Sequence, residues 1–186
     1  MRVYAVAVLM LAVAACASTP PDRTEYLLRY ESPSGVEAVP RQGAARLARV
    51  SVADYLTQPG LAVETAPNVV RSARDHLWAE PLEAGLTMYL RAVIAAQRGE
   101  AVLVRTGGGP ASGPRISVFV EELHGTMTGE ARLVAYFQVA KPGEEMPRDF
   151  RFARSVALER PGYAGLVEAE RTLLDQLASS IAVALE

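Results

Sequence analysis

Cys16 is the only cysteine in this sequence of 186 residues, and its position suggests covalent chemistry. It directly follows Val13-Ala14-Ala15, which end an apolar run that begins at Val3 behind a positively charged Met1-Arg2. A charged start, a short apolar stretch and small residues at its end are typical of a secretory signal peptide. The run is also too short to cross a bilayer, which takes about 20 apolar residues. The sequence therefore predicts an exported protein.

The placement of Cys16 after Val-Ala-Ala resembles the lipobox of bacterial lipoproteins, in which the cysteine becomes the first mature residue. Its thiol would carry diacylglycerol, and its new amino group an acyl chain such as palmitate. Two or three chains anchor a protein firmly, because each buried methylene contributes about 0.8 kcal/mol. Ala17 follows where an aspartate would favour inner-membrane retention, so we expect the periplasmic face of the outer membrane. The alternative is an ordinary signal cleaved elsewhere, with Cys16 discarded.

Composition excludes several classes of protein. Loss of residues 1–15 removes Arg2 and no acid, which leaves 18 basic against 21 acidic side chains and a net charge of −3. The arginines are scattered singly, so no basic surface for nucleic acid is expected. A hydrophobic content of 50% argues against a disordered chain. We expect a signal peptide over 1–15, a lipidated cysteine and flexible linker over 16–24, and a single domain over 25–186.

His76 and His124, the two histidines, are the first candidates for catalysis or metal binding. His76 could pair with Asp75 or stack near Trp78, and His124 follows Glu121-Glu122 closely enough for a Glu/His metal pair to be considered. Neither has the i, i+4 spacing of a His-Glu-x-x-His site, and neither has a cysteine partner. Both are therefore expected to be ordinary surface or turn residues.

Other chemical motifs are incomplete. The glycines at 107–109 are not followed by Lys-Ser/Thr or by the start of a helix, so they do not predict a phosphate-binding loop. No serine stands in Gly-x-Ser-x-Gly. Adjacent glutamates at 121–122 and 144–145 would point to opposite faces of a strand and could not share a proton. We therefore expect no catalytic residue, no metal site and no cofactor.

Periodicity predicts the elements that would carry such residues. Strands are expected at 25–30, 45–55, 61–65, 69–73, 101–105, 115–123, 130–140 and 150–158. Pro81 and Gly99 are expected to bound one amphipathic helix, and a second is expected at about 163–185. Strands mostly in hairpins with two widely separated helices indicate an α+β fold. We expect a mainly antiparallel sheet with both helices packed on one face.

The stretch Val-Ala-Asp-Tyr-Leu-Thr-Gln-Pro-Gly-Leu, followed by a hairpin and by Trp-Ala-Glu-Pro-Leu at 78–82, resembles the ABC-type transport auxiliary lipoproteins. This family includes the paraquat-inducible protein C and YmbA-like type. The resemblance extends from Tyr26-Leu-Leu to the closing helix, nearly all of the mature chain. Trp78, Glu80, Pro81 and Leu82 match the family signature and could form a partner surface. For Trp78 the alternative is a core position at the end of the helix.

The resemblance implies a periplasmic lipoprotein that works beside an MCE-domain protein and inner-membrane transporter components. Such systems move lipids or other hydrophobic molecules between the two membranes. We therefore expect a non-enzymatic accessory lipoprotein, held to the membrane by its N-terminal lipid anchor and docking the MCE partner. The alternative is an envelope assembly or scaffold lipoprotein without a transport role. A homo-oligomer is compatible with either role.

Overall fold

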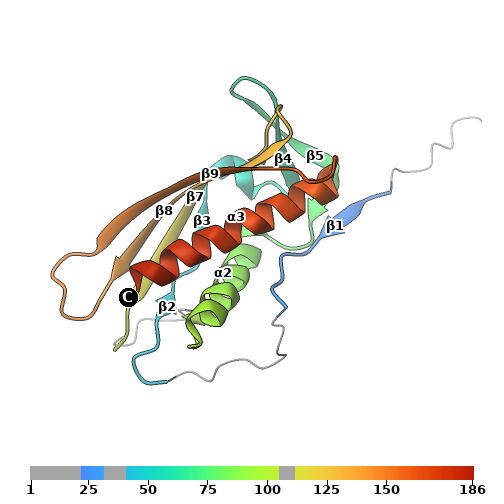
Figure 1. Cartoon of the computed structure of the whole chain (residues 1–186). Helices are drawn as coiled ribbons and strands as arrows, with labels where there is room; N and C mark the ends of the chain where they lie inside the picture. Colours follow the sequence, from blue (N-terminus) through green and yellow to red (C-terminus); the bar gives the residue numbers. More distant parts are fainter. Residues whose placement is uncertain (1–21, 32–40, 105–111) are drawn as a thin grey trace, which may run out of the picture.

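The computed structural model describes residues 22–31, 41–104 and 112–186. The predicted signal peptide, Cys16 and the glycines at 107–109 lie outside these ranges. The described chain folds into one mixed, mainly antiparallel sheet and two long helices that cover the same face of that sheet (Figure 1). The predicted α+β class is therefore confirmed. No helix within the described ranges is long and apolar enough to cross a membrane.

Three long antiparallel strands form the main part of the sheet. They are β7 (Arg115–Gly125), β8 (Glu130–Ala140) and β9 (Arg148–Ala157). Ile116, Val118 and Val120 of β7 are buried and alternate with exposed residues. This alternation follows from the two-residue period of a strand, which turns one face toward the helices and the other toward solvent. The prediction for this hairpin is thus confirmed.

A second hairpin joins β4 (Gly60–Ala66) to β5 (Val69–Trp78). Asn68, between them, has a φ of 63°, a left-handed conformation that asparagine tolerates in tight turns. The strand predicted at 69–73 continues to Trp78. The first strand, β1 (Thr24–Tyr26), lies parallel to β5 at this edge of the sheet.

The prediction of one continuous strand at 45–55 is wrong. The segment divides into β2 (Arg46–Leu47), β3 (Ser51–Val52) and a 3-10 helix, η2 (Asp54–Thr57). The registers in which β2 and β3 pair with β7 differ by one residue, so residues 48–50 lie opposite only residues 117–118, and the Val50 amide donates to the Thr87 hydroxyl instead. Strand β3 then ends where the register of β7 with β8 shifts, between Val120 and Glu122. A bulge of this kind bends a strand and interrupts its pairing. Beside it the hydroxyl of Tyr55 accepts a hydrogen bond from the Leu123 amide at 3.4 Å, so a side chain replaces a ladder partner.

The short strands explain why the sheet is mixed. Both β2 and β3 pair with β7 in parallel, and β6 (Leu103–Val104), the short remnant of the strand predicted at 101–105, pairs with β2 in parallel. The chain reverses its direction between β5, which ends the hairpin, and β6, because α2 connects the two strands. These contacts extend the sheet on the side of β7 that faces away from β8.

The two helices match their predicted bounds closely. Helix α2 (Leu82–Arg98) begins after Pro81 and ends at Gly99, which has a φ of 64° and so forms a left-handed C-cap. Helix α3 (Tyr163–Ala184) packs against β8 and β9 and contacts α2. Between the helices, the Tyr89 hydroxyl donates a hydrogen bond to Asp175 at 2.9 Å. Both apolar stripes are therefore core surfaces.

Glu170 is an exception within the buried face of α3. Its side chain is only 1% exposed, and its Oε2 atom has no hydrogen-bond partner. Burial disfavours the charged carboxylate and raises the pKa of Glu170 from 4.5 to about 8. Its neighbours along the helix, Leu173 and Leu174, are completely buried. The group is therefore an uncharged acid at neutral pH.

We expect the Glu170→Gln variant to change how stability depends on pH. The folded chain binds more protons than the unfolded chain between pH 4.5 and about 8, so wild-type stability falls as pH rises through that window. Glutamine removes this slope. The free energy of unfolding of the variant, compared with that of wild type, therefore rises by on the order of a few kcal/mol between pH 4.5 and a pH above 8. Urea unfolding at pH 4.5 and 8.5 measures the difference. Glu159→Gln, an exposed control, should follow wild type, and parallel wild-type and Glu170→Gln profiles would contradict the argument.

Candidate functional site

The family-signature block at 78–82 lies where the chain first enters the sheet. Strand β1 pairs with the end of β5, with Thr24 opposite His76, Glu25 opposite Leu77 and Tyr26 opposite Trp78. The Ala79 amide then donates a hydrogen bond to the Tyr26 carbonyl at 2.8 Å. The predicted anchor at Cys16 precedes β1 by only a few residues. The block thus holds the segment that connects the domain to its predicted anchor, which we call the tether junction (residues 24–31 with 76–82).

Trp78 and Leu82 point into the core at the tether junction. They are 8% and 6% exposed, respectively, and Leu28 beside them is 2% exposed. The Trp78 amide also donates to the Pro59 carbonyl at 2.7 Å, which fixes the turn before β4. Of the signature residues, only Pro81 is exposed to solvent. The apolar surface of the block is therefore mostly buried, where it holds β1 in place, and little of it is accessible to a partner.

Glu80 makes the polar part of the tether junction. Its carboxylate accepts hydrogen bonds from both terminal nitrogens of Arg29, with Nη2 to Oε2 at 3.0 Å. In this bidentate geometry the two hydrogen bonds fix the relative orientation of the side chains in addition to pairing their charges. The hydrogen bond from Arg29 lowers the pKa of Glu80, and the same contact raises the pKa of Arg29. Sequence reasoning missed Arg29, because its partner lies 51 residues away and no local period relates the two.

Gly85 lets the first turn of α2 approach this ion pair. A Cβ atom placed there would lie 3.2 Å from Oε1 of Glu80 and 3.4 Å from Cβ of Leu28. Such distances are tighter than ordinary contacts, so a side chain at this position would press on the tether junction from inside the domain. The small residue is therefore part of how the junction closes.

His76 fastens the same segment from another direction. A hydrogen bond of 3.2 Å joins its Nδ1 atom to the Tyr26 hydroxyl, and its ring stacks on Tyr163 with centroids 4.1 Å apart. It therefore links β1, β5 and the start of α3, instead of pairing with Asp75 or stacking on Trp78.

His124 is buried within β7 and only 7% exposed, so the prediction of a surface or turn residue is wrong at this position. Its Nε2 atom is 3.7 Å from a carboxylate oxygen of Glu122, and its ring packs edge-on against Tyr55. The Glu122 carboxylate also accepts a hydrogen bond from Arg132. Burial raises the pKa of the Tyr55 hydroxyl to about 12, so it stays protonated. Within the described ranges no three His, Cys, Asp or Glu side chains gather as a metal site.

Comparison with known proteins identifies a family for the fold around this junction. Residues 26–182 match the model of the ABC-type transport auxiliary lipoprotein component. The chain is 27% identical over 184 residues to the intermembrane transport lipoprotein PqiC of Escherichia coli (strain K12), covering 98% of this chain and 96% of the relative. PqiC of Shigella flexneri matches with the same figures.

Two solved structures share the fold. A crystal structure of an uncharacterized protein aligns with a TM-score of 0.74 at 20% identity and covers 89% of this chain and 99% of its own. A protein from Xanthomonas campestris aligns with a TM-score of 0.63 at 17% identity, covering 86% and 92%. Because the identities are low, these two likenesses establish the fold alone.

A Glu80→Gln variant should loosen the tether junction. With one partner uncharged, the segment around Arg29 opens more often, and trypsin should cleave after Arg29 several-fold faster under native conditions. Glu83→Gln is the matched control, because Glu83 also begins α2 and pairs with an arginine, Arg49, at 3.1 Å, but that arginine lies outside the junction. Equal cleavage rates in the two variants would show that the Arg29 pair does not restrain the segment.

Proposed function

The chain belongs to the ABC-type transport auxiliary lipoprotein family, and from this we propose that it is a non-enzymatic accessory lipoprotein of an MCE/ABC-type intermembrane transport system. Its cargo would be lipids or other hydrophobic molecules. The observation that carries the proposal is the extent of the match, which runs from Tyr26, the last residue of β1, through nearly all of α3. The relative's name, intermembrane transport lipoprotein, supports a role in transport.

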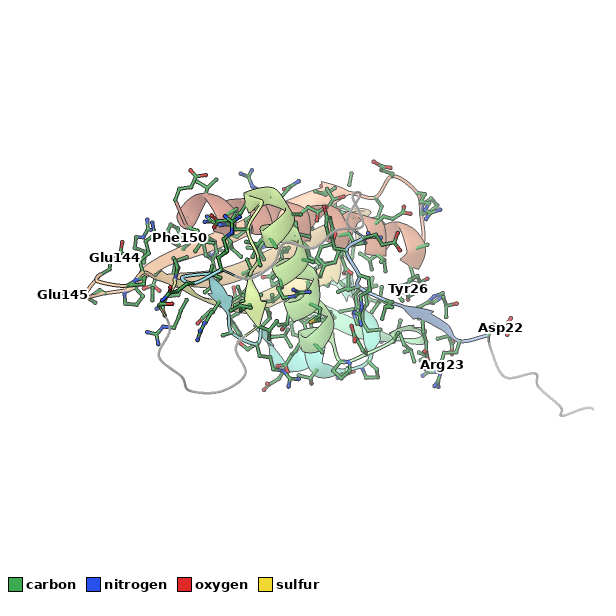
Figure 2. The ribbon with its side chains drawn as sticks, turned by 90° about the horizontal axis from the view of Figure 1, so that it is seen from below. Asp22, Arg23, Tyr26, Glu144, Glu145 and Phe150 are labelled. Atoms are coloured by element: carbon green, nitrogen blue, oxygen red, sulfur yellow. The ribbon has the colours of Figure 1, made fainter. Side chains whose placement is uncertain are left out.

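The proposed anchor is lipidated Cys16, and the proposed location is the periplasmic face of the outer membrane. The architecture supports attachment at one end of the molecule. Figure 2 shows Asp22, Arg23 and Tyr26 at one end and Glu144 and Glu145, in the turn between β8 and β9, at the other. A chain anchored through β1 would therefore extend that turn away from the membrane.

This polarity suggests how the lipoprotein would meet its MCE-domain partner and the inner-membrane components beyond it. A partner that comes from the inner membrane would reach the far turn first. Met146 there is 78% exposed, the most exposed large apolar side chain in the described part of the chain, and it is the position at which a contact of this turn can be probed. The signature block is the competing docking surface, and Ala79 and Pro81 are its exposed members. An envelope scaffold without a transport role would need neither contact.

Photo-crosslinking can separate these docking surfaces. We expect a photoreactive residue at Met146 to capture an MCE-domain protein in cells at native expression, and the same probe at Pro81 to capture little. Capture mainly at Pro81 would move the docking surface to the signature block. Capture of no MCE-domain protein from either position, with the lipoprotein still in the membrane, would contradict the docking and favour the scaffold role.

Replacement of Cys16 tests the anchor independently. The Cys16→Ser protein should lose incorporation of a palmitate analogue and leave the membrane fraction, because no acyl chain can then be attached. Labelling and cell fractionation measure both effects. A variant that still takes up label and stays in membranes would contradict lipidation at this residue.

A further inference from the structure

Two arginines stand directly opposite each other where β2 pairs with β7. The register places Arg46 beside Arg115 in parallel strands, and like charges in such positions repel. Among the described residues, none accepts a hydrogen bond or forms an ion pair with either guanidinium. Elsewhere on the same solvent-facing side of the sheet, Arg132 has Glu122 as a partner and Arg151 has Tyr136. Within the described part of the chain this pair is therefore uncompensated, and it is available to an anion.

The backbone holds this pair in place. The Arg46 amide donates to the Pro114 carbonyl at 2.8 Å, and the Ala48 amide donates to the Ile116 carbonyl at 2.9 Å. Gly113 makes the close approach possible, since a Cβ atom there would lie 2.2 Å from the Gly43 carbonyl oxygen. The two side chains thus start from strands packed against each other and not from a loose loop.

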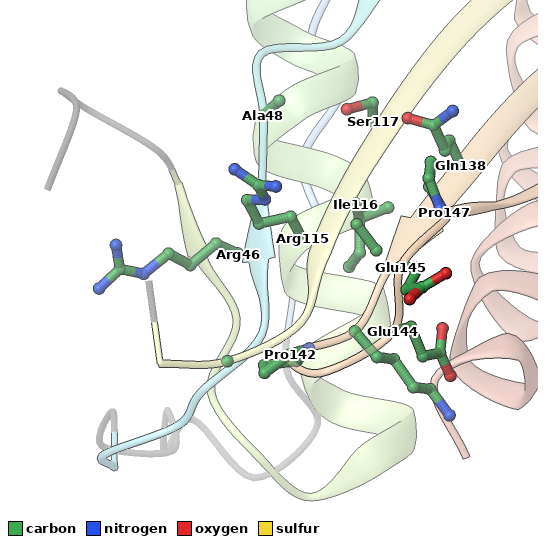
Figure 3. A pocket seen from close by; sticks show the side chains of 13 residues that line it. Arg46, Ala48, Arg115, Ile116, Ser117, Gln138, Pro142, Glu144, Glu145 and Pro147 are labelled. Atoms are coloured by element: carbon green, nitrogen blue, oxygen red, sulfur yellow. The ribbon is translucent and has the colours of Figure 1, made fainter. Parts of the chain in front are cut away.

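A pocket of about 390 Å³ lies beside the arginines (Figure 3). Its volume is within the range of sites for small ligands. Ser117 and Gln138 supply a hydroxyl and an amide to its lining, and Lys141 adds a third cation. Glu144 and Glu145 line it from the side opposite the arginines, as Figure 3 shows. We call this the two-charge pocket.

The arrangement of charge restricts the ligand. Guanidinium groups bind phosphate oxygens well, because their donors form a planar fork. A simple anion would be attracted by the arginines and Lys141, but the two glutamates across the pocket would oppose it, so it satisfies only one side. Arg148 lies 3.8 Å from Glu144 and offsets part of its charge, but Glu145 has no ion-pair partner among the described residues. A ligand with a phosphate at one end and an amine at the other satisfies both sides.

We propose that the two-charge pocket binds a zwitterionic aminoalkyl phosphate, with its phosphate on Arg46 and Arg115 and its ammonium group toward Glu144 and Glu145. Two sources share this chemistry. One is the headgroup of an aminoalkyl phospholipid, a phosphodiester, and the other is a free phosphate monoester in the periplasm. The proposal depends on these side chains and not on the identity of a transport partner.

Calorimetric titration of the full-length lipoprotein in detergent micelles tests the proposal. We expect phosphoethanolamine to bind more tightly than inorganic phosphate or ethanolamine. Arg115→Gln should weaken phosphoethanolamine about tenfold or more, since a hydrogen bond to a charged group is lost. Glu145→Gln should weaken phosphoethanolamine but strengthen inorganic phosphate, because it removes a repulsion. Arg71→Gln, which removes an exposed arginine from β5, is the control and should bind as wild type.

A further ligand identifies the source. Glycerophosphoethanolamine, a phosphodiester without acyl chains, should bind at least as well as phosphoethanolamine if the pocket takes a lipid headgroup, and poorly if it takes a free monoester. Binding of neither compound, or equal binding by wild type and Arg115→Gln, would overturn the proposal. Loss of crosslinking at Met146 in Arg115→Gln, without any binding of these compounds, would instead make the arginines part of a protein contact. Since no partner is present in the titration, its outcome is independent of the proposed docking.

Discussion

The attachment of β1 to β5 is the interaction on which the proposed use of this protein depends. Only three residue pairs form this parallel contact, and a strand held by so few pairs at a sheet edge would fray readily. The tether junction compensates by combining different kinds of contact. Trp78 and Leu82 bury apolar surface, Glu80 binds Arg29, and His76 links Tyr26 to Tyr163. A force applied to the N-terminal segment would therefore be resisted by contacts with the core and not by one edge strand alone.

Local patterns were sufficient to predict the two helices and the long hairpin strands. Pro81 and Gly99 mark the ends of α2 because their backbone preferences suit those two positions and few others. The alternation of Ile116, Val118 and Val120 predicts one buried face in β7, and burial confirms it. These features follow from residues that are neighbours in sequence, so a single sequence contains the required information.

Two features that sequence reasoning missed depend on long-range register. The bulge in β7 determines where β3 stops and η2 begins, but it arises from pairing with β8. Arg46 and Arg115 are 69 positions apart, and only the parallel pairing reveals them as neighbours. Glu170 shows a different limit. Its position lies on the apolar side of α3, and a carboxyl there is identified as buried only once the sheet is in place.

The two ends of the molecule differ in the side chains that they expose. At the tether junction Trp78 and Leu82 turn inward and Glu80 is paired with Arg29, so that end contributes attachment and little exposed apolar surface. At the far end, a turn without regular structure between β8 and β9 brings Lys141, Glu144 and Glu145 beside two arginines. Between the ends, β7 and β8 run as two 11-residue strands under α3. Because packed interiors resist deformation, this layer holds the far turn at a fixed distance from the tether junction.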